Sequence, residues 1–85
     1  MIILKYPLRE AEEQTVMLPA GAVPLSVQSQ NGIPVLWAMV DTSKEKEPRK
    51  IFIVGTGNEV KPPFLVYIST VQMASGFVWH FFIHP

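Results

Sequence analysis

The side chains of this 85-residue chain that could do chemistry are few, and their spacing argues against a metal site. There is no cysteine, and the only histidines are His80 and His84. The residues around them are typical of an extended strand, in which four positions span about 13 Å at roughly 3.3 Å per residue. That separation is too large for two imidazoles to share one ion, and no carboxylates are clustered beside them in the sequence. The sequence therefore predicts no metal site and no cofactor.

Catalytic patterns are also missing. Serine and threonine hydroxyls, His80 and Asp41 are present, but no nucleophile elbow or spaced triad connects them. The run GTGN at residues 55–58 follows a predicted strand, yet no helix pattern or GK[ST] comes after it, so it indicates a turn and not a phosphate loop. Nearly all carboxylates fall in predicted loops and not in a cleft: Glu10, Glu12, Glu13, Asp41, Glu45, Glu47 and Glu59. We expect the protein not to be an enzyme.

The composition favours association with other proteins. Hydrophobic residues make up 48% of the chain and charged residues only 16%, well below the roughly 25% of an average domain. Few charges make it hard for a small domain to cover its apolar surface, which predicts a homo-oligomer or a permanent partner. The formal net charge is zero, which predicts no binding to nucleic acid or to anionic membranes. The apolar stretches are too short to span a bilayer, and the first residues lack the pattern of a signal peptide.

The clearest structural signal is the pair Asn31–Gly32, which lies between two extended runs and predicts a hairpin with a type I′ turn. A two-residue loop fixes the register, so Val27 faces Leu36 on a wholly apolar side, together with the pairs Leu25 with Ala38 and Val23 with Val40. The other side mixes polar and apolar residues: Ser26, Gln28, Gln30, Ile33, Val35, Trp37 and Met39. We interpret this mixed side as a contact surface centred on Trp37; alternatively, another part of the chain buries it.

A second hairpin is predicted from residues 64–73 and 77–84, closed by residues 74–76 with glycine at the third loop position. In that register Tyr67, Ser69 and Val71 share the core side with Phe77, Trp79, Phe81 and Ile83. The opposite side carries Ile68, Thr70 and Gln72 with Val78, His80, Phe82 and His84. Because this side is again half polar, His80 and Phe82 join the candidate contact residues.

Shorter strands are expected at residues 1–6, 15–18 and 49–54, the last of them interior, with a turn at 9–14 and an exposed loop at 41–48. Pro34 lacks an N–H and predicts a sheet edge at that point. Together these elements predict a single domain, residues 1–85, that is all-β: a small β-sandwich or open barrel of six or seven mostly antiparallel strands. The expected core is Val23, Leu25, Val27, Leu36, Ala38, Ile51, Ile53, Tyr67, Val71, Trp79 and Phe81.

Several sequence motifs of the chain are similar to those of a known group of proteins: KYPL (residues 5–8), QTVMLPAGA (14–22), LSVQSQNG (25–32), PVLWAMVD (34–41), FIVGTGN (52–58) and YISTVQ through FVWHFF (67–82). Nearly end to end, the chain resembles a group of small uncharacterised proteins of tailed bacteriophages and prophages. The resemblance implies a viral origin and a location in the cytoplasm of the bacterial host. It supplies no activity, cofactor or catalytic residue for these positions.

Two functions are compatible with these observations. The first is a non-enzymatic phage accessory protein that binds a host protein or a small ligand, for example against a host defence system. The alternative is a structural or assembly component of the virion. We expect a homo-oligomer, most simply a twofold dimer, that uses a sheet face with Trp37 or Phe82. The candidate interaction residues are Gln28, Trp37, Met39, His80 and Phe82.

Overall fold

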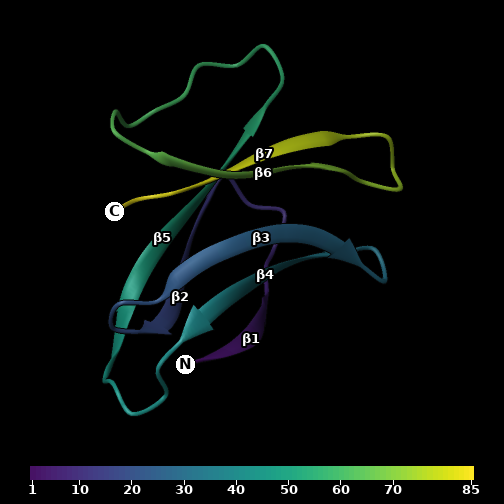
Figure 1. The fold of residues 1–85 in the computed structure, drawn as a ribbon. Coiled ribbons are helices and arrows are strands. Elements are labelled where there is room, and N and C mark those ends of the chain that lie inside the picture. Colours follow the sequence, from purple (N-terminus) through teal and green to yellow (C-terminus); the bar gives the residue numbers. More distant parts are fainter.

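The computed structural model describes all residues from 1 to 85 and consists of β-strands joined by turns and loops (Figure 1). The seven strands are β1 (Ile2–Pro7), β2 (Glu13–Pro19), β3 (Val23–Gln30), β4 (Ile33–Val40), β5 (Lys46–Gly55), β6 (Val66–Gln72) and β7 (Val78–Ile83). They form two antiparallel sheets, a three-stranded sheet of order β1-β4-β3 and a four-stranded sheet of order β2-β5-β7-β6. The predicted all-β class and strand number are confirmed, and the architecture is a small β-sandwich. No helix long and apolar enough to cross a membrane is present.

The β3–β4 hairpin forms as its turn residues predict. Asn31 and Gly32 both have positive φ, 53° and 79°, as a type I′ turn requires, and Gln30 pairs with Ile33. Four side chains that project inward from these two strands are completely buried: Val27, Leu36, Ala38 and Val40. This part of the predicted register is therefore confirmed.

The first half of β3, which is farther from the turn, departs from the predicted register. A bulge at Leu25 shifts the pairing, so that Pro24 lies opposite Ala38 and Val23 lies opposite Met39. A bulge adds one residue to a strand and turns the following side chains to the other face. Val23 and Leu25 are accordingly 43% and 45% exposed, and their assignment to the core was wrong.

The predicted sheet edge at Pro34 was also wrong, because β4 is the central strand of its sheet. Strand β1 pairs with it only as far as Pro7, which lies opposite Val35. Just beyond that point, the backbone N–H of Leu8 donates to the carbonyl of Pro34 at 2.8 Å. Pro34 is tolerated inside the sheet because its missing N–H falls at the end of the β1 ladder, where only the reciprocal of this last bond is lost.

The β6–β7 hairpin has the predicted three-residue loop, but the far end of β6 is displaced. Gly76 has φ of 95°, and Met73 accepts a hydrogen bond from its N–H at 2.9 Å. A second bulge, at Ile68, shifts the register so that Tyr67 pairs with Phe82 and not with an inward-facing residue. Tyr67 is 55% exposed, so its assignment to the core was wrong as well.

Two loops differ from expectation. Strand β5 begins at Lys46, where it pairs with Pro19, so the exposed loop after Asp41 is shorter than the predicted 41–48. The charged side chains of Lys46 and Glu47 stay in solvent, while the backbone of these residues extends the pairing of β5 with β2. At the start of β2, Gln14 is buried and its amide bonds both the N–H and the carbonyl of Arg9 in the preceding turn, at 2.9 and 2.7 Å. These bonds hold the turn that was expected near residues 9–14.

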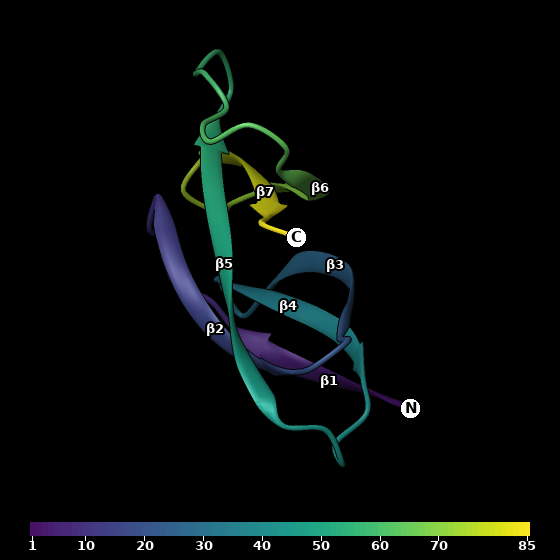
Figure 2. The ribbon, with the colours of Figure 1, turned by 90° about the vertical axis from the view of Figure 1, so that its left-hand side faces the viewer.

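The core lies between the two sheets. Figure 2 shows both the three-stranded sheet and the β6–β7 hairpin on one side of the long strand β5. The buried apolar cluster is Leu8, Leu18, Ala22, Val27, Leu36, Ala38, Val40, Ile51, Val71, Met73, Phe81 and Ile83, with Ile53 and Trp79 only partly buried against it. Where the edges of the sheets meet, the buried Ser69 hydroxyl accepts the Val27 N–H at 2.8 Å. This bond ties β6 to β3.

Candidate interaction surface

The structure divides the five predicted interaction residues between two sheets. Gln28, Trp37 and Met39 lie on the solvent-facing side of the β1-β4-β3 sheet, which we call the outer face. His80 and Phe82 lie on β7, in the other sheet, facing away from the core. The predicted residues therefore form two separate groups, one on β4 and its neighbour β3, and the other on β7.

The outer face is held rigidly by its central strand. Trp37, on β4, lies opposite Lys5 of β1 and Ser26 of β3, so its backbone has a neighbour on both sides. Trp37 and Met39 are half-buried, and Gln28 is exposed. The alternative that another part of the chain covers Trp37 completely does not apply. A partly exposed, pre-positioned tryptophan is the kind of residue that dominates binding energy at protein interfaces.

The side chain of Lys5 crosses this face. Its ammonium group donates to Gln30 Oε1 at 2.9 Å, and Gln30 lies on the far strand of the sheet. By register, the crossing passes over Val35, which is only 3% exposed. The aliphatic part of a lysine commonly covers apolar surface in this way. Lys5 is thus directed along the face and away from the free edge of β1.

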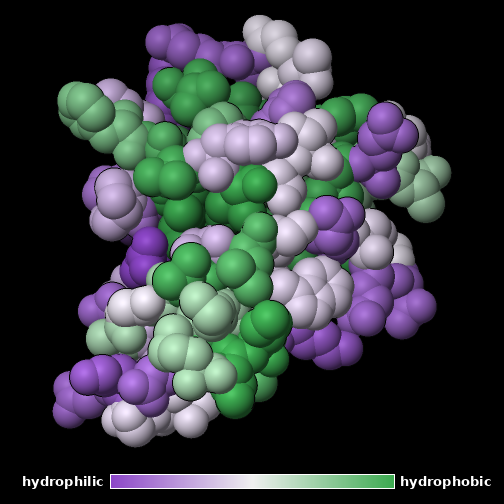
Figure 3. Space-filling view, in the orientation of Figure 1, coloured by the Kyte–Doolittle hydropathy of each residue, from purple (hydrophilic) through white to green (hydrophobic).

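The outer face is almost without charge. All fourteen charged residues of the chain lie in residues 5–13, 41–50 and 59–61, so β3 and β4 contain none, and Lys5 is the only one on β1. Exposed apolar residues border the face, among them Ile3 (59%), Ile33 (50%) and Val23 (43%). Figure 3 shows apolar residues in a band through the middle of the molecule, with hydrophilic residues mainly at the periphery. Depletion of charge is typical of the centre of a protein interface.

The β7 group is organised around His80. Its Nδ1 and Nε2 atoms lie 2.9 Å and 2.8 Å from the hydroxyls of Thr70 and Thr56, and Thr70 in turn lies 2.7 Å from the hydroxyl of Tyr67. In the neutral ring one nitrogen donates and the other accepts, and hydroxyls can serve both roles. Both nitrogens therefore lie within hydrogen-bond distance of a hydroxyl, which fixes the orientation of the ring. Phe82 packs edge-on against Tyr67, with ring centroids 5.7 Å apart.

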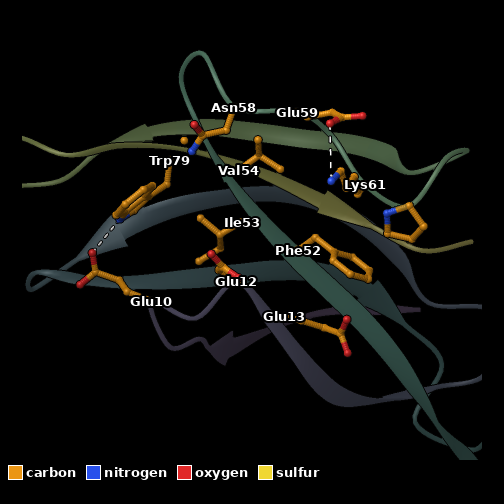
Figure 4. A pocket seen from close by; sticks show the side chains of 12 residues that line it. Glu10, Glu12, Glu13, Phe52, Ile53, Val54, Asn58, Glu59, Lys61 and Trp79 are labelled. Atoms are coloured by element: carbon orange, nitrogen blue, oxygen red, sulfur yellow. Dashed lines mark hydrogen bonds and ion pairs between the residues drawn. The ribbon is translucent and has the colours of Figure 1, made fainter.

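The largest concave feature is a cleft of about 800 Å³ beside the second half of β5 (Figure 4). Phe52, Ile53 and Val54 line it from β5, and Trp79 lines it from β7. The indole Nε1 donates to Glu10 Oε1 at 2.7 Å, and the ring stacks on Phe77 with centroids 5.1 Å apart. Trp79 is consequently a wall of the cleft as well as a partly buried core residue.

Four of the seven carboxylates line this cleft, namely Glu10, Glu12, Glu13 and Glu59. The expectation that the carboxylates do not gather in a cleft was therefore wrong. Two of them are in exposed ion pairs, Glu13 with Lys50 at 3.3 Å and Glu59 with Lys61 at 3.5 Å. No sequence pattern joins residues 10–13 to Glu59, because only the ends of β2 and β5 bring them together. No group of three or more histidine, aspartate or glutamate side chains is close enough to hold a metal ion.

Comparison with known proteins places the chain in a family. No curated protein and no solved structure matches it. A family model described as a domain of unknown function (DUF7352) matches residues 1–85, the full length of the chain. The protein therefore belongs to the DUF7352 family.

Proposed function

We propose that the protein acts by binding another protein, without enzymatic activity, and that the outer face of the three-stranded sheet is its contact surface. The observation that carries the proposal is a partly exposed tryptophan at the centre of a sheet face with almost no charge. Trp37 and Met39 offer a rigid apolar anchor, and Gln28 offers hydrogen bonds at the margin.

The biological setting comes from the resemblance to phage proteins. On that basis the protein is a bacteriophage accessory protein in the cytoplasm of the bacterial host, and its partner is a host protein such as a component of a defence system. Neutral net charge argues against nucleic acid or an anionic membrane as the partner. A small ligand, if one binds, would occupy the cleft next to Trp79, where an aromatic wall and carboxylates converge.

Affinity capture from a bacterial host lysate tests the proposal with a matched pair of variants. Trp37→Glu places a charge in the centre of the outer face. Met17→Glu makes the same change on β2 of the other sheet, at a methionine that is 49% exposed. We expect one captured protein to be lost with Trp37→Glu and retained with Met17→Glu, while both variants keep the wild-type thermal transition. Equal capture by all three proteins, or equal loss with both variants, would contradict the assignment of the surface.

The second candidate function is a structural or assembly component of the virion. It is favoured by the free edge of β1, because strand edges can join subunits into larger arrays. Mass spectrometry of purified phage particles separates the two functions. The accessory role predicts that the protein is found in infected cells and is absent from particles, whereas stoichiometric amounts in particles would favour the virion role.

A further inference from the structure

The free edge of β1 is an exposed strand edge that carries apolar residues. Strand β1 pairs with β4 on one side and has no neighbour on the other. Its apolar residues are exposed on both faces of the sheet: Ile2 is 51%, Ile3 59% and Leu4 37% exposed. An exposed apolar edge strand is a template for pairing with another strand, and proteins usually protect such edges with charges, prolines or bulges.

The edge lacks most of this protection. Lys5 is the only charged residue of β1, and its ammonium group is held by Gln30 on the far side of the sheet. No bulge interrupts the pairing of β1 with β4. Pro7 alone protects the edge, at its last residue.

The direction of the backbone groups follows from the β3–β4 turn. Gln30 and Ile33 flank a two-residue loop and so form a hydrogen-bonded pair, which directs the backbone groups of Pro34, Leu36, Ala38 and Val40 toward β1. The Leu8 N–H to Pro34 carbonyl bond agrees with this alternation. On β1, the backbone groups of Ile2, Leu4 and Tyr6 therefore point toward β4. The N–H and C=O groups of Ile3 and Lys5 point the other way, toward solvent at the free edge of the sheet.

We propose that a second copy of this chain occupies the edge, through antiparallel pairing of β1 with β1 about a twofold axis at Leu4. In this register Ile3 of each copy lies opposite Lys5 of the other, and each pair exchanges both backbone hydrogen bonds. Leu4 meets Leu4 between them on the inner side. This register uses the backbone N–H and C=O groups of Ile3 and Lys5 that point toward the free edge. Pro7, which lacks an N–H, lies at the end of the paired segment.

The occupant is a second copy because the strand complements itself. The backbone donors and acceptors of its free edge are symmetric about Leu4, and on the inner side Leu4 meets Leu4 of the other copy. Two chains of zero net charge do not repel each other. The result is a continuous sheet of order β3-β4-β1-β1-β4-β3 that carries two outer faces side by side. The dimer contact is thus the β1 edge, where the sequence alone suggested a face with Trp37 or Phe82.

This inference goes beyond the proposed function, because the edge pairs whether or not the outer face binds a host protein. A contact of one short strand is at the small end of interface sizes, so we expect a dimer that dissociates at roughly micromolar concentration. Sedimentation equilibrium at tens of micromolar should give about twice the 9.6 kDa mass of the chain. Trp37→Glu should leave this mass unchanged, which separates failure of the dimer from failure of partner binding.

Charge variants at Ile3 test the register. Ile3→Lys sets lysine opposite Lys5 of the second copy, whereas Ile3→Glu sets an opposite charge there, and both remove the same isoleucine. We expect the dissociation constant of Ile3→Lys to exceed that of Ile3→Glu by at least about tenfold. Ile33→Lys, at a similarly exposed isoleucine of the same face but far from the edge, should keep the wild-type value.

Hydrogen exchange supplies a second readout. The amides of Ile3 and Lys5 should be protected at dimer concentrations and lose that protection on dilution. A monomer mass at tens of micromolar would overturn the proposal, as would equal constants for Ile3→Lys and Ile3→Glu. Equal weakening by Ile33→Lys would overturn the choice of surface. Protection of these amides only in a complex with a captured host protein would assign the edge to that protein and not to a second copy.

Discussion

At the scale of single residues, the bond between Ser69 and Val27 is the most consequential polar contact. The Val27 side chain is fully buried and Ser69 is 8% exposed, and the hydroxyl accepts the backbone N–H across the junction of the two sheets. An N–H left without a partner in such a site costs about 1 to 3 kcal/mol.

We therefore expect Ser69→Ala to lower the free energy of unfolding by about 1 to 3 kcal/mol, measured by urea denaturation. Ser26→Ala is the matched control, because the Ser26 hydroxyl is partly buried at the same junction, 3.4 Å from the Ser69 hydroxyl, but does not bond the Val27 N–H. Its effect should stay within about 0.5 kcal/mol. Equal effects of the two substitutions would show that the bond does not join the sheets in solution.

Asp41 is the residue whose titration the structure perturbs. Hydrogen bonds from the Ser43 hydroxyl at 2.7 Å and the Ser43 N–H at 3.0 Å hold the pKa of Asp41 below its ordinary value of 3.8. Because the folded pKa is the lower one, these bonds stabilise the fold above the unfolded pKa, and that contribution disappears as the pH falls through the folded pKa.

An NMR titration of the Asp41 carboxyl should therefore give a midpoint below 3.8 in the wild type. Ser43→Ala should move the midpoint upward, since it removes the hydroxyl donor. Thr42→Ala, at the neighbouring position of the same loop, should leave it in place. An unchanged midpoint in Ser43→Ala would mean that the turn is not formed in solution.

At the scale of elements, the two hairpin turns organise the fold. At Gly32 a Cβ atom would meet nothing within 4 Å, so the only penalty for a side chain there is the backbone conformation at φ of 79°. Gly32→Ala should lower the free energy of unfolding by about 1 to 2 kcal/mol. Asn31→Gly, at the adjacent positive-φ position, should change it by less than about 0.5 kcal/mol. A neutral Gly32→Ala would contradict the type I′ turn.

These turns were predictable from the sequence, and the bulges were not. Asn31–Gly32 and the glycine at position 76 determine loop length, and loop length determines the register close to the loop. Leu25 and Tyr67 lie farther along their strands, where an inserted residue reverses the faces without a local sequence signal. Both residues are apolar, so alternation alone placed them in the core. Their exposure could be learned only from the assembled sheets.

Pro34 illustrates the same limit for strand order. Its missing N–H was predicted to mark an edge, but the sequence does not show where the neighbouring strand ends. Strand β1 stops at Pro7, one position before an N–H from Pro34 would have been needed. A proline therefore fits in a central strand at the end of a ladder, and sequence alone does not distinguish this from an edge.

At the scale of the whole molecule, charge separates the surface into two regions. The outer face of the three-stranded sheet is nearly uncharged, whereas the cleft beside β5 is lined by four of the seven carboxylates. The first region was anticipated from the mixed side of the predicted hairpin, which named Trp37, Met39 and Gln28. The cleft was not, because it is built from segments distant in sequence and its carboxylates share no motif.

The central claim is that this uncharged face is a protein-binding surface. Its most direct test is calorimetric titration of the captured host protein, once purified, with wild-type protein and with Trp37→Ala. Because a central interface tryptophan commonly contributes at least 2 kcal/mol, we predict that Trp37→Ala raises the dissociation constant by about 30-fold or more, with Met17→Ala as the unchanged control. A dissociation constant within about twofold of the wild type for Trp37→Ala would contradict the claim.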